Sequence, residues 1–161
     1  MPLNGRGKLF DASLDAMERA WREAGAAPRI LLGGTVKASF ERAARAMSAG
    51  WVSPLFDLGT LREGAAAVAR AWDEAGRPGR PRIITGRYFS LGPDADAIAD
   101  AYIHHYYGAA YFEAARSETL TTGEQIEAEL GRLAEAGCDD VLLFPCAGDL
   151  EQVALLAAEL D

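Results

Sequence analysis

Four segments of the sequence end in the dipeptide Ala-Gly, and an apolar run follows soon after each of them. Glycine just past the end of a helix adopts the left-handed conformation without a Cβ penalty, so each dipeptide predicts a helix end. The apolar runs are continuous rather than alternating, which is typical of parallel strands buried on both faces. The dipeptides end at Gly25, Gly50, Gly76 and Gly137, and the runs cover residues 30–32, 51–52, 83–84 and 141–144.

The sequence between these runs carries signals for helix starts. Thr60 with Glu63, and Thr122 with Gln125, match the capping box, in which a side chain and the backbone satisfy each other's donors. Asp149 resembles a cap for a last helix. Between residues 106 and 122 the pattern weakens, and we expect a loop or a short helix there.

Helix and strand that alternate this regularly predict βα units, right-handed crossovers and a parallel sheet of about four strands. The fold class is therefore α/β. The chain has 161 residues and no low-complexity linker, so we expect a single domain over residues 1–161.

Charge and hydropathy narrow the classes of partner. The chain carries 16 Lys and Arg against 24 Asp and Glu, a formal net charge of −8, which repels phosphate backbones and anionic lipid surfaces. We therefore expect no nucleic acid and no membrane among its partners. No run reaches the ~20 apolar residues of a membrane span, and the first residues lack the apolar core of a signal peptide, which favours a cytoplasmic protein. Cys138 and Cys146 flank the last apolar run, too far apart along a strand for a disulfide, so we expect free thiols.

The most informative loop is Gly33-Gly34-Thr35-Val36, between the first predicted strand and the next helix. Two glycines let the backbone approach a ligand closely, and the free N–H groups at a helix start favour an anion, above all a phosphate. The alternative is a plain turn with Thr35 as the helix cap. Local spacing alone favours the plain turn, because a Gly-Gly turn is a weak motif.

Other candidates have equally plain alternatives. Arg87 and Tyr88 end the third predicted strand and would line a substrate pocket at the carboxyl ends of the strands. An arginine there pairs well with an acidic substrate or a cofactor phosphate. The alternative is a solvated strand end with aromatic packing. On local evidence, Trp51 is more often a core residue than a cofactor contact. His104 and His105 have no metal-ligand partner at the right spacing, so we expect a surface or packing role and no metal. The sequence has no Walker loop, G-x-G-x-x-G, H-E-x-x-H, C-x-x-C or G-x-S-x-G motif.

Several segments, taken in order, extend these motifs: RGKLFD at 6–11, PRILLGG at 28–34, GW at 50–51, GEQI at 123–126, AGCDDVLLF at 136–144 and DLEQV at 149–153. They are similar to consecutive segments of the bacterial luciferase-like flavin-dependent oxidoreductases. Members of that family are (βα)8 barrels that bind FMN or the deazaflavin F420 and use it to reduce substrates or to activate dioxygen. The resemblance covers the C-terminal half of such a barrel, so it implies a truncated TIM barrel.

The resemblance also implies roles for single residues. Gly33, Gly34, Thr35 and Val36 match the phosphate side of the family's cofactor loop. Gly50-Trp51 matches a Gly-Asp-Gly-Trp-like cofactor segment, although Ser48-Ala49 stand where an Asp-containing pair is usual. No catalytic base carries over, because none of the matched positions is one.

Half a barrel leaves two sheet edges and one apolar face uncovered. We expect a homodimer first, or a partner chain, to complete the fold. Three functions follow: a flavin-dependent oxidoreductase or monooxygenase acting on a small organic substrate; a non-catalytic flavin-binding or partner subunit; and a cofactor-independent enzyme on a hydrophobic substrate.

Overall fold

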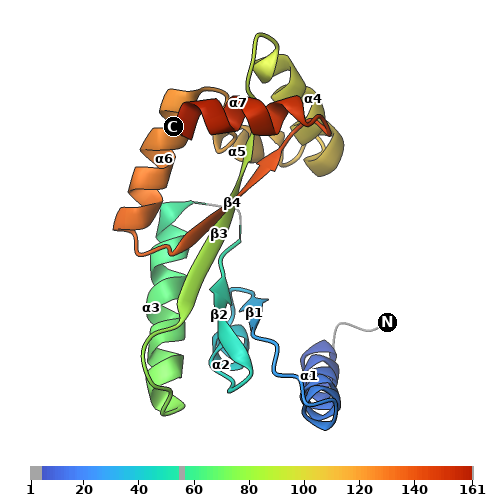
Figure 1. Ribbon diagram of the computed structural model, residues 1–161, viewed down its shortest axis with the longest axis vertical. Coiled ribbons are helices and arrows are strands. Elements are labelled where there is room, and N and C mark those ends of the chain that lie inside the picture. Colours follow the sequence, from blue (N-terminus) through green and yellow to red (C-terminus); the bar gives the residue numbers. More distant parts are fainter. Residues whose placement is uncertain (1–4, 55–56, 161) are drawn as a thin grey trace. The chain divides into compact units, whose positions relative to one another are not determined.

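A computed structural model describes residues 5–54 and 57–160 of the chain (Figure 1). Helices and strands alternate, and the strands form one sheet in the order β1-β2-β3-β4, with parallel pairing of β1 with β2 and of β3 with β4. The predicted α/β class and the four predicted strands are confirmed. The elements are α1 (Arg6–Glu23), β1 (Ile30–Gly33), α2 (Lys37–Ala43), β2 (Ser48–Val52), α3 (Leu58–Glu74), β3 (Arg82–Phe89), α4 (Ala95–Tyr107), α5 (Phe112–Ser117), α6 (Gly123–Glu135), β4 (Asp140–Pro145) and α7 (Glu151–Leu160).

The backbone contacts divide the chain into two compact units. Unit 1 comprises Met1–Val52 with Glu63–Ile83, and unit 2 comprises Ser53–Arg62 with Ile84–Asp161. Each unit combines segments that are distant in sequence. The expectation of a single domain stays a prediction.

The core of unit 1 forms around Trp51 on β2, whose side chain is fully buried. Its ring meets Phe40 of α2 edge-on, with the centroids 5.7 Å apart. It also lies so close to Gly64 of α3 that a Cβ at that position would overlap the indole. Helix α1 is tied to α2 by a two-pronged ion pair, in which Arg42 Nε and Nη2 donate to the Asp11 carboxylate at 2.7 and 3.1 Å.

The core of unit 2 lies between the β3–β4 pair and its helices. Residues Ile84 to Phe89 pair in register with Asp140 to Pro145. Four fully enclosed side chains form the cluster, and four leucines pack around it: Phe89, Leu91, Leu120 and Ile126, with Leu130, Leu143, Leu155 and Leu156. The amide of Gln152 accepts from the Leu91 N–H at 2.8 Å and donates to its carbonyl at 2.9 Å, which fastens α7 to the segment after β3.

Three of the four predicted helix ends are confirmed. Gly25, Gly76 and Gly137 follow α1, α3 and α6 with positive φ values of 67°, 65° and 85°. The prediction for Gly50 is wrong, because this residue lies within β2. A Cβ there would overlap the backbone of Arg82 on β3, so this glycine permits the close approach of two strands and ends no helix.

The predicted caps have mixed outcomes. The Thr122 hydroxyl accepts from the Gln125 N–H at 3.2 Å, as expected, and the Asp149 carboxylate accepts from the Glu151 N–H at 2.9 Å. The assignment of Thr60 as a cap is wrong. Helix α3 starts earlier, and the Asp57 carboxylate accepts from both the N–H and the hydroxyl of Thr60 at 2.9 Å. Asp57 directly precedes the first helical residue and therefore takes the capping position, whereas Thr60 lies inside the first turn.

Strand β4 departs from the expectation of burial on both faces. Leu142 and Phe144 are 49% and 41% exposed, whereas Leu143 between them packs into the core. Successive side chains of a strand point to opposite faces, so one face of β4 is covered by helices and the other is open. Cys138 and Cys146 are free thiols, as predicted.

Candidate functional site

The loop after β1 has a fixed backbone conformation. Gly34 has a φ of 116°, and a Cβ at this position would overlap the side chain of Ser39 in α2. The indole Nε1 of Trp51 donates a 2.8 Å hydrogen bond to the Gly34 carbonyl oxygen. The positive φ and the contact with Ser39 favour glycine at position 34, and the hydrogen bond from Trp51 ties the turn to β2.

The same loop, after its two glycines, has backbone N–H groups without a hydrogen-bond partner in the described chain. Within the described chain, the backbone N–H groups of Thr35 and Val36 donate no hydrogen bond. Both residues are exposed, Val36 by 62%, and Val36 has the extended conformation of a residue that precedes a helix. Adjacent free N–H groups on a rigid turn suit an anionic oxygen-rich group. The residues present therefore fit a phosphate.

Trp51 is part of the core rather than of the loop surface. Its side chain has 0% exposure, so it reaches a ligand only through the turn that its N–H supports. The sequence identified both Trp51 and Gly34 as candidates, and the structure brings them together. Their hydrogen bond could not be read from the sequence, because it depends on how β1 and β2 pair.

Arg87 lies in unit 2 beneath the helices. Its Nε donates to Glu129 Oε1 of α6 at 2.8 Å, and its Nη1 donates to the Gly86 carbonyl at 2.7 Å. The Arg87 and Glu129 side chains are 1% and 2% exposed. Glu129 also pairs with Arg132, which reaches solvent. The enclosed guanidinium holds β3 to α6.

Tyr88 lies on the opposite face of β3, beside Phe144 of β4. Three rings surround it, with centroids 5.5 Å away for Tyr102, 6.1 Å for Tyr107 and 6.0 Å for Phe144. The hydroxyl of Tyr107 donates to that of Tyr88 at 3.4 Å, and burial raises the pKa of the Tyr88 hydroxyl well above its usual range. We call Tyr88, Tyr102, Tyr107 and Phe144 the aromatic cluster.

Sequence reasoning found one member of the aromatic cluster and missed three. Tyr102 and Tyr107 lie on α4 at a spacing of five residues, which no simple helical stripe would select. The apolar run 141–144 predicts a buried strand, which gives Phe144 no role beyond the core. Tyr88 and Phe144 are direct partners in the pairing of β3 with β4, so their side chains lie on the same face of the sheet. Only knowledge of this register links the two residues.

Three further observations concern the described part of the chain. No group of three His, Cys, Asp or Glu side chains there is arranged to hold a metal ion. The ring of His104 packs against Phe112 with the centroids 5.8 Å apart. No described helix is both long enough and apolar enough to cross a bilayer.

Comparison with solved structures shows the same fold in several oxidoreductases. An F420-dependent secondary alcohol dehydrogenase bound to an F420-acetone adduct matches with a TM-score of 0.61 and 15% identity, over 81% of this chain and 46% of that one. The monooxygenase RslO1 from Streptomyces bottropensis matches with a TM-score of 0.53 and 17% identity, over 83% and 47%. The F420-dependent tetrahydromethanopterin reductase from Methanopyrus kandleri matches with a TM-score of 0.53 and 13% identity, over 80% and 48%.

The chain thus spans about half the length of these structures, which are TIM-barrel enzymes. No curated protein sequence matches it. The profile of the luciferase-like monooxygenases matches residues 1–159, almost the whole chain. This chain belongs to the luciferase-like monooxygenase family.

Proposed function

We propose that this chain is half of a luciferase-like barrel that, once completed, acts as a flavin-dependent oxidoreductase on a small organic substrate. The observation that carries the proposal is the family match over residues 1–159, together with a rigid turn in that match whose N–H groups are unused. When bound, FMN or F420 would supply hydride transfer or the activation of dioxygen. The chain itself would bind and orient the cofactor.

The cofactor's phosphate would lie on the loop after β1. The N–H groups of Thr35 and Val36 would donate to it, and Gly33 and Gly34 leave room for close approach. Trp51 would act as a positioning residue, because its bond to the Gly34 carbonyl holds the turn.

The aromatic cluster would form one wall of the substrate pocket. Tyr88 and Phe144 lie on one face of the sheet, where Tyr102 and Tyr107 of α4 pack against Tyr88 and Phe144 stays 41% exposed. Flat apolar rings suit a small organic substrate. Arg87 would support this wall from the other face of β3 rather than touch the substrate, since consecutive residues of a strand point to opposite faces.

A second copy of the chain would complete the barrel. The outer strands β1 and β4 each have one edge without a neighbouring strand in the described sheet, and β4 exposes Leu142 and Phe144. Two half-barrels would cover these edges and faces, with an expected interface above ~1,000 Å². A separate partner chain is the alternative.

Light scattering of a matched pair of variants tests this assembly. Phe144→Asp places a charge on the open face of β4, whereas Val153→Asp places the same charge on α7, where Val153 is 58% exposed. We expect the wild-type protein and Val153→Asp to be dimers and Phe144→Asp to be a monomer. A monomeric wild-type protein whose sheet edges are protected from hydrogen exchange would refute completion by a second copy.

Visible absorption with added FMN or F420 tests the cofactor. Val36→Glu adds a negative charge beside the proposed phosphate on a side chain that is already exposed, and Val153→Glu is the matched control. We expect saturable binding of one cofactor, weakened at least tenfold by Val36→Glu and unchanged by Val153→Glu. If neither cofactor produces a spectral or thermal response, the function as a flavin-dependent enzyme is refuted.

The same titration separates the remaining functions. Binding without turnover, with a reductant present, would indicate a non-catalytic flavin-binding or partner subunit, a function favoured by a chain that spans 46% of its structural neighbour. Turnover of a hydrophobic substrate without any cofactor would indicate a cofactor-independent enzyme.

A further inference from the structure

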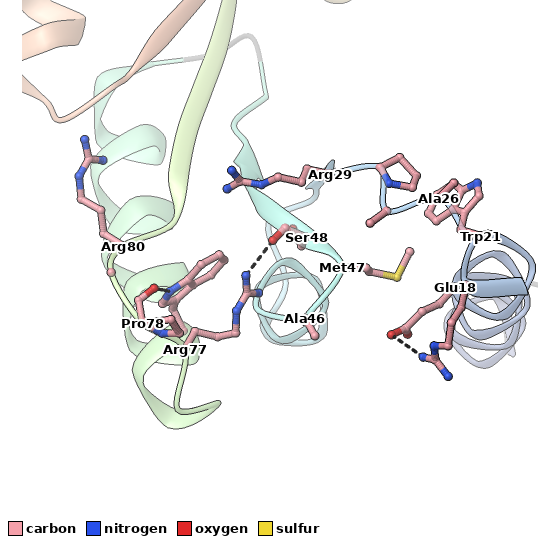
Figure 2. A pocket seen from close by; sticks show the side chains of 15 residues that line it. Glu18, Trp21, Ala26, Arg29, Ala46, Met47, Ser48, Arg77, Pro78 and Arg80 are labelled. Carbon is pink, nitrogen blue, oxygen red and sulfur yellow. Dashed lines mark hydrogen bonds and ion pairs between the residues drawn. The ribbon is translucent and has the colours of Figure 1, made fainter. Parts of the chain in front are cut away.

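Unit 1 has a cavity at the opposite end of its strands from the cofactor loop. Its volume is about 560 Å³, within the range of small-molecule sites. Arg29 lies directly before β1 and Met47 directly before β2, so the cavity opens at the amino ends of these strands (Figure 2). Gly34 lies at the carboxyl end of β1. The cavity is therefore separate from the site proposed above.

The walls of the cavity combine apolar and cationic groups. The apolar part comes from α1, from the segments before β1 and β2, and from the end of α3, and consists mainly of Trp21, Pro28, Met47, Trp72 and Pro78. The charged part has four arginines, Arg22, Arg29, Arg77 and Arg80, against one acid, Glu18. In a chain with a net charge of −8, this concentration of positive charge is local.

The single acid of the cavity wall does not neutralise Arg29 or Arg77. Glu18 lies 3.3 Å from Arg22 and 3.7 Å from Arg45, both of which compete for its charge. Among the described residues, no ion pair or hydrogen bond engages the guanidinium of Arg29, which is exposed. Arg29 is therefore available to an anion.

Arg77 is a fixed cation with unused donors. Its guanidinium stacks on Trp72, 3.7 Å from the ring centroid. Its Nη1 donates to the carbonyls of Ala44 and Arg45, and its Nη2 donates to that of Ser48 at 3.0 Å. A guanidinium has five N–H groups, so the Nε–H and one Nη2–H are left without an acceptor in the described chain. Burial and the nearby charge of Arg29 lower the pKa of Arg77, as expected where two like charges share one site.

We propose that this cavity binds a small organic anion, in which a carboxylate or a phosphate monoester is joined to an apolar ring. The anionic group pairs with Arg29 and with the free edge of Arg77, since guanidinium edges match such oxygens in geometry. The ring lies against Trp21 and Met47. The charge of the ligand relieves the repulsion between the two arginines, which a neutral ring compound does not do. Its ring adds the apolar contacts that an inorganic ion lacks.

Isothermal titration calorimetry of the full chain at low salt tests the proposal. The probes are phenyl phosphate, benzoate, inorganic phosphate and benzyl alcohol. We expect saturable binding of phenyl phosphate and benzoate, at least tenfold weaker binding of inorganic phosphate, and no binding of benzyl alcohol. Absence of binding by both aryl anions, or equal binding of inorganic and phenyl phosphate, would overturn the proposal.

Matched variants locate the binding. Arg29→Gln removes the available cation, and Arg19→Gln removes the same charge from an exposed position of α1 outside the cavity. We expect at least a tenfold loss of affinity for phenyl phosphate in the first and no change in the second. Ala46→Glu, at an exposed position in the wall, adds an acid and is expected to abolish binding with an unchanged circular dichroism spectrum. Equal losses in Arg29→Gln and Arg19→Gln would show general charge attraction and refute the site.

Discussion

The Arg87 guanidinium and the Glu129 carboxylate meet at 2.8 Å between β3 and α6, with both side chains almost fully removed from water. Neither charge is solvated, and one Arg87 nitrogen, Nη2, has no hydrogen-bond partner in the described structure. A buried pair of this kind gains stability only while both charges are present, because each compensates the desolvation of the other.

Removing one partner of this pair should therefore be costly. We expect Glu129→Ala to lower the free energy of unfolding by about 3–5 kcal/mol, since it leaves an uncompensated buried cation. Replacement of both residues, Arg87→Met with Glu129→Leu, should recover most of that loss. Urea unfolding followed by circular dichroism measures both effects. Arg22→Ala, which breaks an exposed ion pair with Glu18, is the control and should change stability by less than about 1 kcal/mol. A Glu129→Ala protein as stable as this control would contradict the prediction.

The bond between Trp51 and Gly34 gives a second prediction. Trp51→Phe keeps most of the ring packing and removes the donor, so we expect a stability loss of about 1–3 kcal/mol, including the cost of an unpaired carbonyl. Cofactor affinity should fall as the turn loosens. Trp72→Phe is the matched control, because it removes a 3.2 Å hydrogen bond to Pro78 in the same unit without touching the turn. Equal cofactor affinity in the two variants, measured by absorption titration, would exclude a positioning role for Trp51.

Asp57 gives a prediction about the start of α3. Hydrogen bonds from the N–H and the hydroxyl of Thr60 lower the pKa of Asp57. A carboxyl group with a lowered pKa in the folded state stabilises the fold above its unfolded pKa, and this contribution disappears as the pH falls through the folded value. We expect Asp57→Ala to lower the melting temperature by a few degrees at pH 7, and Asp57→Asn by less. The difference between wild type and Asp57→Ala should shrink below about pH 4 in calorimetric melts. A difference that is constant with pH would show that the charge of Asp57 plays no part.

Cys146 gives a prediction at alkaline pH. Burial raises the pKa of its thiol to about 11, partly offset by the charge of Arg116. Because the folded state holds the proton to a higher pH than the unfolded state, stability falls as the pH rises between about 9 and 11, by up to about 1.4 kcal/mol for each pH unit. We expect the stability advantage of wild type over Cys146→Ala to decrease between pH 8 and pH 10.5 in urea unfolding. The comparison cancels the tyrosines, which titrate in both proteins. An advantage that does not change over this interval would contradict the assignment.

The fold was largely predictable because local signals and the tertiary structure agree. Apolar runs at four regular positions and glycines with positive φ after α1, α3 and α6 are features of the local sequence. Gly50 looked the same in sequence but serves a contact between strands, which only the pairing of β2 with β3 explains. The prediction for Thr60 failed for a local reason, since α3 starts at Leu58 and Asp57, three residues before Thr60, takes the capping position. The open face of β4 could not be read from a run of apolar residues.

The candidate site was less predictable. The sequence indicated Gly34 and Trp51 separately, and the pairing of β1 with β2 brings them into hydrogen-bond contact. It also grouped Arg87 with Tyr88, although the alternation of a strand directs one toward Glu129 and the other toward Tyr107. The cavity beside Arg29 has no sequence signal, because its lining comes from α1, from the segments before β1 and β2, and from the end of α3 with the residues after it. Contacts of this kind depend on tertiary packing, and a single sequence does not encode them as a pattern.

The aromatic residues of the two units differ in kind. All three tryptophans, Trp21, Trp51 and Trp72, belong to unit 1, and all five tyrosines belong to unit 2. Indole emission therefore reports on the unit that holds the cofactor loop, and the phenol bands of near-ultraviolet circular dichroism report on the unit that holds the aromatic cluster. Melting curves recorded with both signals would coincide for one cooperative domain and separate for two, so the chain carries intrinsic probes of its own cooperativity.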